Sequence, residues 1–136
     1  MNQLDCIGVS NEGFEMKVVI SGSRSVKSLN SEAIARIDTI INLGAEIVVG
    51  DCYGVDTLVQ RYLASKNYTN VTVYHIGSKP RNNCGAFSTV RVESSRQVDK
   101  DKAMCAIADY GLAIWDGESR GTKANIDRVP TRVVRV

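Results

Sequence analysis

The sequence predicts an α/β fold in which helices cover both faces of a mainly parallel sheet. Three observations lead to this fold class. Short runs of apolar, β-branched residues recur along the 136-residue chain, helical patterns of ten or more residues separate them, and glycine-containing loops follow several of the runs. Because a helix of that length between strands favours a right-handed crossover, the strands that it joins are expected to be parallel. The expected architecture is a doubly wound, Rossmann-like three-layer sandwich.

The composition fits one domain. At 43% hydrophobic residues a chain of this length can bury a sizeable core, and we expect a single domain over 16–136, preceded by an N-terminal arm or extra strand over 1–15. The 17 basic and 15 acidic residues leave a net charge of +2, too little for a broad attraction to a nucleic-acid duplex or an anionic membrane. The apolar runs are far shorter than the ~20 residues of a membrane helix, and no signal segment opens the chain, so we expect a cytoplasmic protein without a membrane partner.

Local patterns predict the first strand, the first helix and the second strand. Met16–Ser21 is predicted as a buried strand because the run Val18–Ile20 is β-branched and no polar residue interrupts it. Asn30 is a suitable N-cap for the following helix, and Gly44 stands just beyond the end of that helix. The apolar stripe of the helix consists of Ile34, Ile37 and Ile41. Glu46–Val49 is the second predicted strand.

The rest of the chain continues the alternation. The second helix is expected to begin near Asp56. Its apolar face consists of Leu58, Val59, Tyr62 and Leu63. After a strand over Val71–Ile76, the irregular stretch Gly77–Ser88 is long for a connection inside a domain, so we expect it to be functional or mobile. The remaining expected elements are a short extended piece at Thr89–Val92, a helix over Ser95–Asp109, a strand over Gly111–Trp115, a short helix from Thr122 and a last strand over Thr131–Val136.

Three glycine-containing loops follow predicted strands, at the sheet edge where doubly wound domains bind ligands. They are the first loop (Gly22–Ser25), the second loop (Gly50–Thr57) and the third loop (Asp116–Thr122). Glycines let the backbone approach an anion closely, and a following helix offers unpaired N–H groups. The short hydroxyl donors in the first and third loops are Ser23, Ser25, Ser119 and Thr122. Because Arg24 adds a side chain able to form two charged hydrogen bonds, the loops predict a site for phosphate or ribose oxygens.

Each feature also has a purely structural explanation. One such loop alone is more often an ordinary turn. Asp56 is predicted to be at least a helix N-cap, and a capping role alone would explain it. Asp101 lies on the apolar stripe of the third predicted helix, between Val98 and Cys105; it either satisfies first-turn amides, or receives a ribose hydroxyl or holds Arg24. No loop has the pattern G-x-x-x-x-G-K-S/T or G-x-G-x-x-G, which disfavours standard NTPases and dinucleotide oxidoreductases.

No metal site or required cofactor is expected. The chain has one histidine, His75, and its four cysteines form no C-x-x-C pair. The cysteines are Cys6, Cys52, Cys84 and Cys105. We therefore expect free thiols.

Three stretches of the chain together resemble the SLOG superfamily of Rossmann-like nucleotide-binding domains. They read ISGSR, VVGDCYGVDTL and KDKAMCAIADYGLAIWDGESRGTKANI. The resemblance covers residues 17 to about 128 and is nearest to the small stand-alone YspA-like branch, related to the Lonely Guy proteins and to the core of DNA-processing protein A. It implies a sheet of about five strands, a nucleotide-derived ligand and a homodimer or higher homo-oligomer. The ligand-binding residues expected from the loops and the resemblance are Gly22, Ser23, Arg24, Gly50, Gly54, Asp56, Lys100, Asp101, Met104, Asp116, Gly117, Ser119, Gly121 and Thr122.

Departures from the family pattern bear on catalysis. The resemblance to Lonely Guy phosphoribohydrolases implies a P-G-G-x-G-T-x-x-E motif, whose glutamate serves glycosidic cleavage, and an arginine before the helix methionine. Here Asn125 stands at the glutamate position and Lys100 at the arginine position. Because an amide neither accepts a proton nor stabilises an oxocarbenium ion as a carboxylate does, binding without hydrolysis is favoured.

Three functions follow as hypotheses. The first is a module that senses or sequesters a nucleotide or nucleotide-derived molecule, of the ADP-ribose or cyclic-nucleotide kind, as in phage or bacterial conflict systems. The alternative is a nucleoside 5′-monophosphate phosphoribohydrolase that uses Asp101 and Glu118. The third is a single-stranded DNA-binding module, which the near-neutral charge and the 6% aromatic content disfavour. Its small basic patch would consist of Lys79, Arg81, Arg91 and Arg96.

Overall fold

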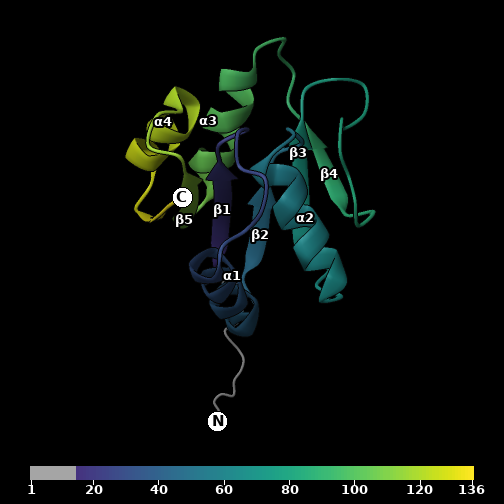
Figure 1. Cartoon of the computed structure of the whole chain (residues 1–136). Coiled ribbons are helices and arrows are strands. Elements are labelled where there is room, and N and C mark those ends of the chain that lie inside the picture. Colours follow the sequence, from purple (N-terminus) through teal and green to yellow (C-terminus); the bar gives the residue numbers. More distant parts are fainter. Residues whose placement is uncertain (1–14) are drawn as a thin grey trace.

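Six parallel strands lie between two layers of helices in the computed structural model, which describes residues 15–136 (Figure 1). The elements are β1 (Lys17–Gly22), α1 (Ser31–Leu43), β2 (Glu46–Val49), α2 (Val55–Ser65), β3 (Val71–His75), β4 (Ser88–Arg91), α3 (Gln97–Ile107), β5 (Tyr110–Trp115), α4 (Arg120–Arg128) and β6 (Thr131–Arg135). The strands follow the order β4–β3–β2–β1–β5–β6, and every neighbouring pair is parallel. The predicted α/β sandwich is confirmed.

The sheet has six strands, whereas about five were expected. The short extended piece after the long irregular stretch is the strand β4, which pairs with β3 so that Thr72 lies opposite Ser88 and His75 opposite Arg91. All four residues of β4 are exposed, so the strand lacks the apolar signature of a buried one. Backbone pairing at the edge of β3 makes it a strand. The arm or extra strand expected over 1–15 falls outside the described residues except for Glu15.

Alternate residues of the central strands pack against different helices. In β1, Val18 and Ile20 belong to the larger core beneath α1 and α2, whereas Val19 belongs to the smaller core with Met104 of α3. The helices contribute to the larger core Ala33, Ile37, Ile40, Val55, Val59 and Leu63. Because both faces of the sheet are covered, its central strands are continuous β-branched runs instead of alternating polar and apolar residues.

The chain reverses its direction across the sheet beside β1. It runs outward from β1 through β2 and β3 to β4, and α3 then brings it back to β5 on the other side of β1. The connections that leave β1 and β5 therefore pass to opposite faces, and a crevice opens between them at the carboxyl ends of these strands. This is the place in the fold where the first and third loops meet.

The ends of the helices match those predicted from the sequence only in part. The Asn30 side chain accepts a hydrogen bond from the Ala33 N–H at 2.9 Å, and Gly44 ends α1 in the left-handed conformation with φ of 72°, as predicted. The prediction that Asp56 is a helix N-cap is wrong. Gly54 occupies that position of α2 and Asp56 lies in the first turn, where its Oδ2 atom accepts a hydrogen bond from the Cys52 N–H at 3.0 Å. The two-residue shift frees this carboxylate to face the crevice.

Candidate functional site

A cavity of about 460 Å³ lies at the carboxyl ends of β1 and β5, between α3 and α4. The first loop, the third loop and the start of α2 complete its wall. Its volume falls within the range of about 300–1,000 Å³ that is usual for small-molecule sites. Arg24, Asp101 and Ser119, which come from three separate parts of the chain, all line it. The topology therefore gathers the predicted loops around one hollow.

The first loop passes very close to neighbouring backbone. A Cβ atom at Gly22 would lie 2.6 Å from the Ile114 carbonyl oxygen and 2.5 Å from the Val55 side chain, so this position requires glycine. The Ser23 N–H donates to the same Ile114 oxygen at 3.1 Å, and the Ser23 hydroxyl accepts a hydrogen bond from the Asp116 N–H at 3.1 Å. Ser23 is buried by these contacts, whereas the Arg24 side chain is exposed on the cavity wall. The loop thus holds Arg24 beside β5.

Asp116 organises the third loop. Its Oδ1 atom accepts hydrogen bonds from the N–H groups of Glu118 and Ser119 at 2.9 and 2.8 Å, and its Oδ2 atom accepts one from the Ser25 hydroxyl at 2.8 Å. These contacts hold the pKa of Asp116 well below its usual range. The carboxylate therefore stays ionised and joins the third loop to the first.

The N-terminus of α4 is open toward the cavity. Its N-cap residue, Ser119, caps no backbone amide with its side chain, and the Ser119 hydroxyl lies 3.2 Å from the Thr122 hydroxyl. A Cβ atom at Gly121 would meet nothing within 4 Å. Because the first amides of a helix have no partner inside the helix, α4 presents N–H groups and two hydroxyls where a ligand anion could approach.

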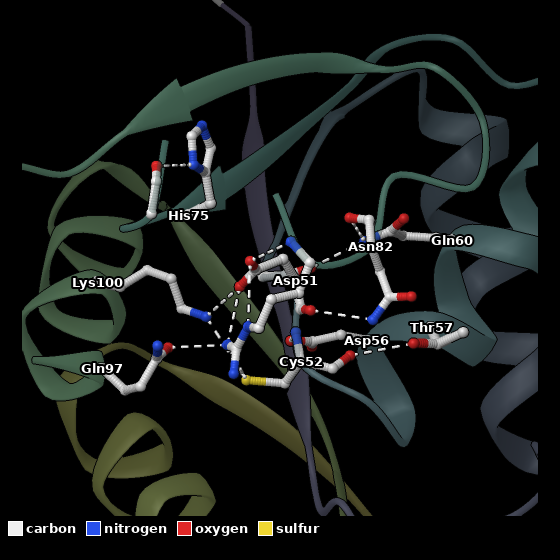
Figure 2. A network of polar contacts seen from close by, with 12 residues as sticks. Asp51, Cys52, Asp56, Thr57, Gln60, His75, Asn82, Gln97 and Lys100 are labelled. Atoms are coloured by element: carbon white, nitrogen blue, oxygen red, sulfur yellow. Dashed lines mark hydrogen bonds and ion pairs between the residues drawn. The ribbon is translucent and has the colours of Figure 1, made fainter. Parts of the chain in front are cut away.

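The second loop is used mainly for internal contacts (Figure 2). The Lys100 ammonium donates to Asp51 Oδ1 at 2.8 Å, and the side chains of Lys100 and Asp51 are 1% and 3% exposed. Arg81, from the connection between β3 and β4, donates to both Asp51 oxygens at 3.0 and 3.3 Å, and its backbone N–H donates to Oδ2 at 2.8 Å. Burial acts to raise the pKa of Asp51, but the hydrogen bonds from Arg81 and Lys100 outweigh it and hold the pKa well below its usual range.

The same network fastens the connection between β3 and β4. Arg81 also donates to the Gln97 side chain at 3.1 Å and to the Cys52 sulfur at 3.0 Å. The Asn82 side chain donates to the Asp51 carbonyl at 3.1 Å, and Gln60 Oε1 accepts from the Cys84 N–H at 2.8 Å. The long irregular stretch is therefore tied to the second loop, α2 and α3 by side chains from each.

Two further acids face the cavity from α2 and α3. Burial raises the pKa of Asp56 to about 7, against the lowering effects of the Cys52 N–H and the Lys100 charge. Burial also raises the pKa of Asp101, although Lys100, Arg128 and the Asn125 amide act in the opposite direction. A ligand that supplies hydrogen-bond donors to these two acids would offset part of the cost of burying them.

Nine of the fourteen predicted ligand-binding residues line the cavity: Gly22, Arg24, Asp56, Asp101, Met104, Asp116, Ser119, Gly121 and Thr122. The other five do not line it, namely Ser23, Gly50, Gly54, Lys100 and Gly117. Gly50 and Gly54 serve close packing, since a Cβ atom at Gly50 would lie 2.7 Å from Asp56 and one at Gly54 would lie 2.5 Å from the Arg24 backbone. Lys100 is committed to Asp51. Glu118, expected beside Asp101 in an enzyme, is exposed and does not line the cavity.

Ser21, Gln97 and Arg128 line the cavity but were not among the predicted residues. Arg128 donates to Asn125 Oδ1 at 2.7 Å, and Asn125 is 5% exposed. A usable signal was present in the sequence, since Thr122, Asn125 and Arg128 are spaced by three and so share one face of α4. Ser21 had no such signal, because its place inside a strand resembles that of any small core residue.

Comparison with known proteins found no matching family model, no matching curated protein and no matching solved structure. Among residues 15–136 no group of three or more histidine, cysteine or acidic side chains is placed to hold a metal ion. Over the same residues no helix is both long and apolar enough to span a membrane.

Proposed function

We propose that this chain binds a nucleotide or nucleotide-derived small molecule in the cavity between α3 and α4. The observation that carries the proposal is the position of the cavity at the reversal point of the sheet, with Arg24 and the open N-terminus of α4 on its wall. Ligands of open α/β sheets bind at this point, and helix N-termini with an arginine are suited to phosphate.

The charge of the cavity is compatible with an anion. Arg24 and Arg128 bring two positive charges, and the pKa of Asp56, raised by burial to about 7, lowers the negative charge that this acid carries at neutral pH. Asp116 stays ionised, but its oxygens accept hydrogen bonds from the third loop and from the Ser25 hydroxyl of the first loop. A phosphate at the start of α4 therefore meets donors in place of free carboxylate oxygens.

The side chain at the expected catalytic position favours binding over hydrolysis. Asn125 is buried, and its Oδ1 atom accepts from Arg128 at 2.7 Å and lies 3.6 Å from the Cys105 sulfur. Its oxygen is thus engaged and its amide has no proton-transfer chemistry to offer. We also propose that the chain acts as a sensor or sequestering module and is related to the SLOG superfamily. We propose further that it is cytoplasmic and forms a homo-oligomer.

Titration calorimetry tests the proposal with a panel of AMP, other nucleoside monophosphates, cyclic nucleotides and ADP-ribose. We expect at least one of them to bind, and Arg24→Ala to weaken that binding by about tenfold or more, because a charged hydrogen bond is lost. Arg61→Ala is the matched control, since Arg61 is an exposed arginine on α2 that does not line the cavity. Native mass spectrometry of the same protein gives the subunit count and any retained ligand.

The proposal fails if the folded protein binds nothing in the panel and retains no ligand. It also fails if Arg24→Ala and Arg61→Ala bind the best ligand as well as the unmodified protein does.

A further inference from the structure

The cavity contains a buried hydroxyl group that no group among residues 15–136 satisfies. Ser21, in β1, is 9% exposed and lines the cavity, and its hydroxyl forms no hydrogen bond within the residues that the structure describes. Since Val19 belongs to the core beneath α3, the two-residue period of a strand places Ser21 on that same face. A buried hydroxyl without a partner is unfavourable, so a polar ligand atom at this point would be stabilising.

Two carboxyl groups of the cavity also have free hydrogen-bonding capacity. Within the part of the chain that the structure describes, Asp56 accepts one hydrogen bond, on its Oδ2 atom, from the Cys52 N–H at 3.0 Å. Asp101 lies near the Asn125 amide and the charged side chains of Lys100, Arg128 and Arg24, all of which act to lower its pKa. A carboxylate can accept about four hydrogen bonds, so each acid has room for donors from a ligand. Asp116 differs, because three protein donors already occupy it.

The complementary ligand needs two kinds of group in one molecule. Arg24 and Arg128 can only donate hydrogen bonds, so they match an anion, whereas Asp56 and Asp101 match hydroxyl groups. A phosphorylated sugar with neighbouring hydroxyl groups carries both. A sugar that lacks one of these hydroxyl groups would leave a partly buried acid or the Ser21 hydroxyl unpaired, and sites built on hydrogen bonds discriminate strongly against such analogues.

We propose that the cavity selects ribose phosphates over 2-deoxyribose phosphates. Asp56, Asp101 and Ser21 hold the ribose hydroxyl groups, and Arg24 with the N-terminus of α4 holds the phosphate. This inference depends on the proposed nucleotide-binding function and adds a sugar specificity to it. It separates ribonucleotide-derived ligands from deoxyribonucleotides and from DNA.

Paired titrations test the inference. The probes are ribose 5-phosphate against 2-deoxyribose 5-phosphate, and AMP against 2′-deoxy-AMP. We expect the ribose member of at least one pair to bind about tenfold or more tightly than its partner, because a hydrogen bond to a charged group is lost with the hydroxyl. Asp101→Asn and Ser21→Ala should each reduce this ratio toward one. Asp127→Asn, which removes an exposed carboxylate of α4 paired with Lys123, should leave the ratio unchanged.

The outcomes separate the two proposals. Equal binding of the two members in every pair that binds overturns the sugar specificity and leaves the nucleotide-binding function standing. A preference for ribose that survives in both Asp101→Asn and Ser21→Ala, with each variant shown to be folded by circular dichroism, overturns the assignment of these residues. If no probe and no member of the wider nucleotide panel binds, the nucleotide-binding function fails and the sugar specificity fails with it.

Discussion

The buried ion pair between Asp51 and Lys100 gives the sharpest prediction about stability. Asp51→Asn removes the carboxylate and leaves the Lys100 ammonium, 1% exposed, without its counter-ion. Removing one partner of a buried pair costs about 3–5 kcal/mol, because an uncompensated charge stays buried. The Arg81 side chain is 37% exposed, so its pairing with Asp51 adds only about 1 kcal/mol or less. We therefore expect the free energy of unfolding to fall by about 3–5 kcal/mol, and Tm by roughly 10–20 °C.

A second substitution separates the lost charge pair from other effects of the variant. In Asp51→Asn/Lys100→Met the buried ammonium is gone, and an unbranched apolar side chain fills its space. We expect this double variant to be about 2 kcal/mol or more stable than Asp51→Asn alone, because replacing both partners of a buried pair is often neutral. Arg91→Ala, which removes an exposed pair with Glu93 at 3.9 Å, is the control and should change the free energy by about 0.5 kcal/mol or less.

Urea unfolding followed by circular dichroism and by the fluorescence of Trp115, the single tryptophan, measures all of these values. A loss below about 1 kcal/mol in Asp51→Asn would refute the reasoning, and so would a double variant no more stable than the single one. Acid unfolding offers an independent check. Because the folded state lowers the pKa of Asp51, its contribution to stability is present above the ordinary value of 3.8 and is lost as the pH falls below it.

Three other predictions concern a titrating acid, two glycines and a helix cap. Between pH 4 and 7 the folded state keeps a proton on Asp56 that the unfolded chain releases. The free energy of unfolding should therefore be highest near pH 4 and fall by up to ~1.4 kcal/mol per pH unit as the pH rises. Urea unfolding at several pH values should show a flatter pH dependence in Asp56→Asn, and an unchanged pH dependence would contradict this assignment. Gly54→Ala should lower the free energy of unfolding by about 2 kcal/mol or more, because φ is 85° and the new Cβ atom would lie 2.5 Å from the Arg24 backbone. Gly44→Ala, where φ is 72° and the space is open, should lower it by only about 1 kcal/mol. Equal losses for the two variants in thermal unfolding would show that the clash at Gly54 is absent. Asn30→Ala should lower the free energy of unfolding by about 1 kcal/mol, because the cap of α1 is lost. Asn30→Asp is the control, since its side chain keeps an acceptor. Equal melting temperatures for the two variants would count against the cap.

The sequence by itself determined the elements whose signals are local. The β-branched runs of β1 and β2 are long and apolar because both faces of the sheet are covered, and this pattern can be read without knowing what covers them. Asn30 and Gly44 mark the ends of α1 through contacts within four residues. The sequence also predicted that the three loops lie at one edge of the sheet, because the carboxyl ends of parallel strands share that edge.

Tertiary structure decided which polar groups face the cavity. Lys100 and Asp51 are 49 positions apart, and nothing in the spacing of either residue shows that the ammonium pairs with that acid and does not line the cavity. In the same way β4 became a strand only by pairing its backbone with β3, and Ser21 lines the cavity because separate parts of the chain meet around the end of β1. Patterns of apolar residues repeat along the chain because each helix or strand must bury one side. The partner of a buried charge or hydroxyl depends on how elements distant in the sequence pack together, and no local sequence pattern specifies that packing.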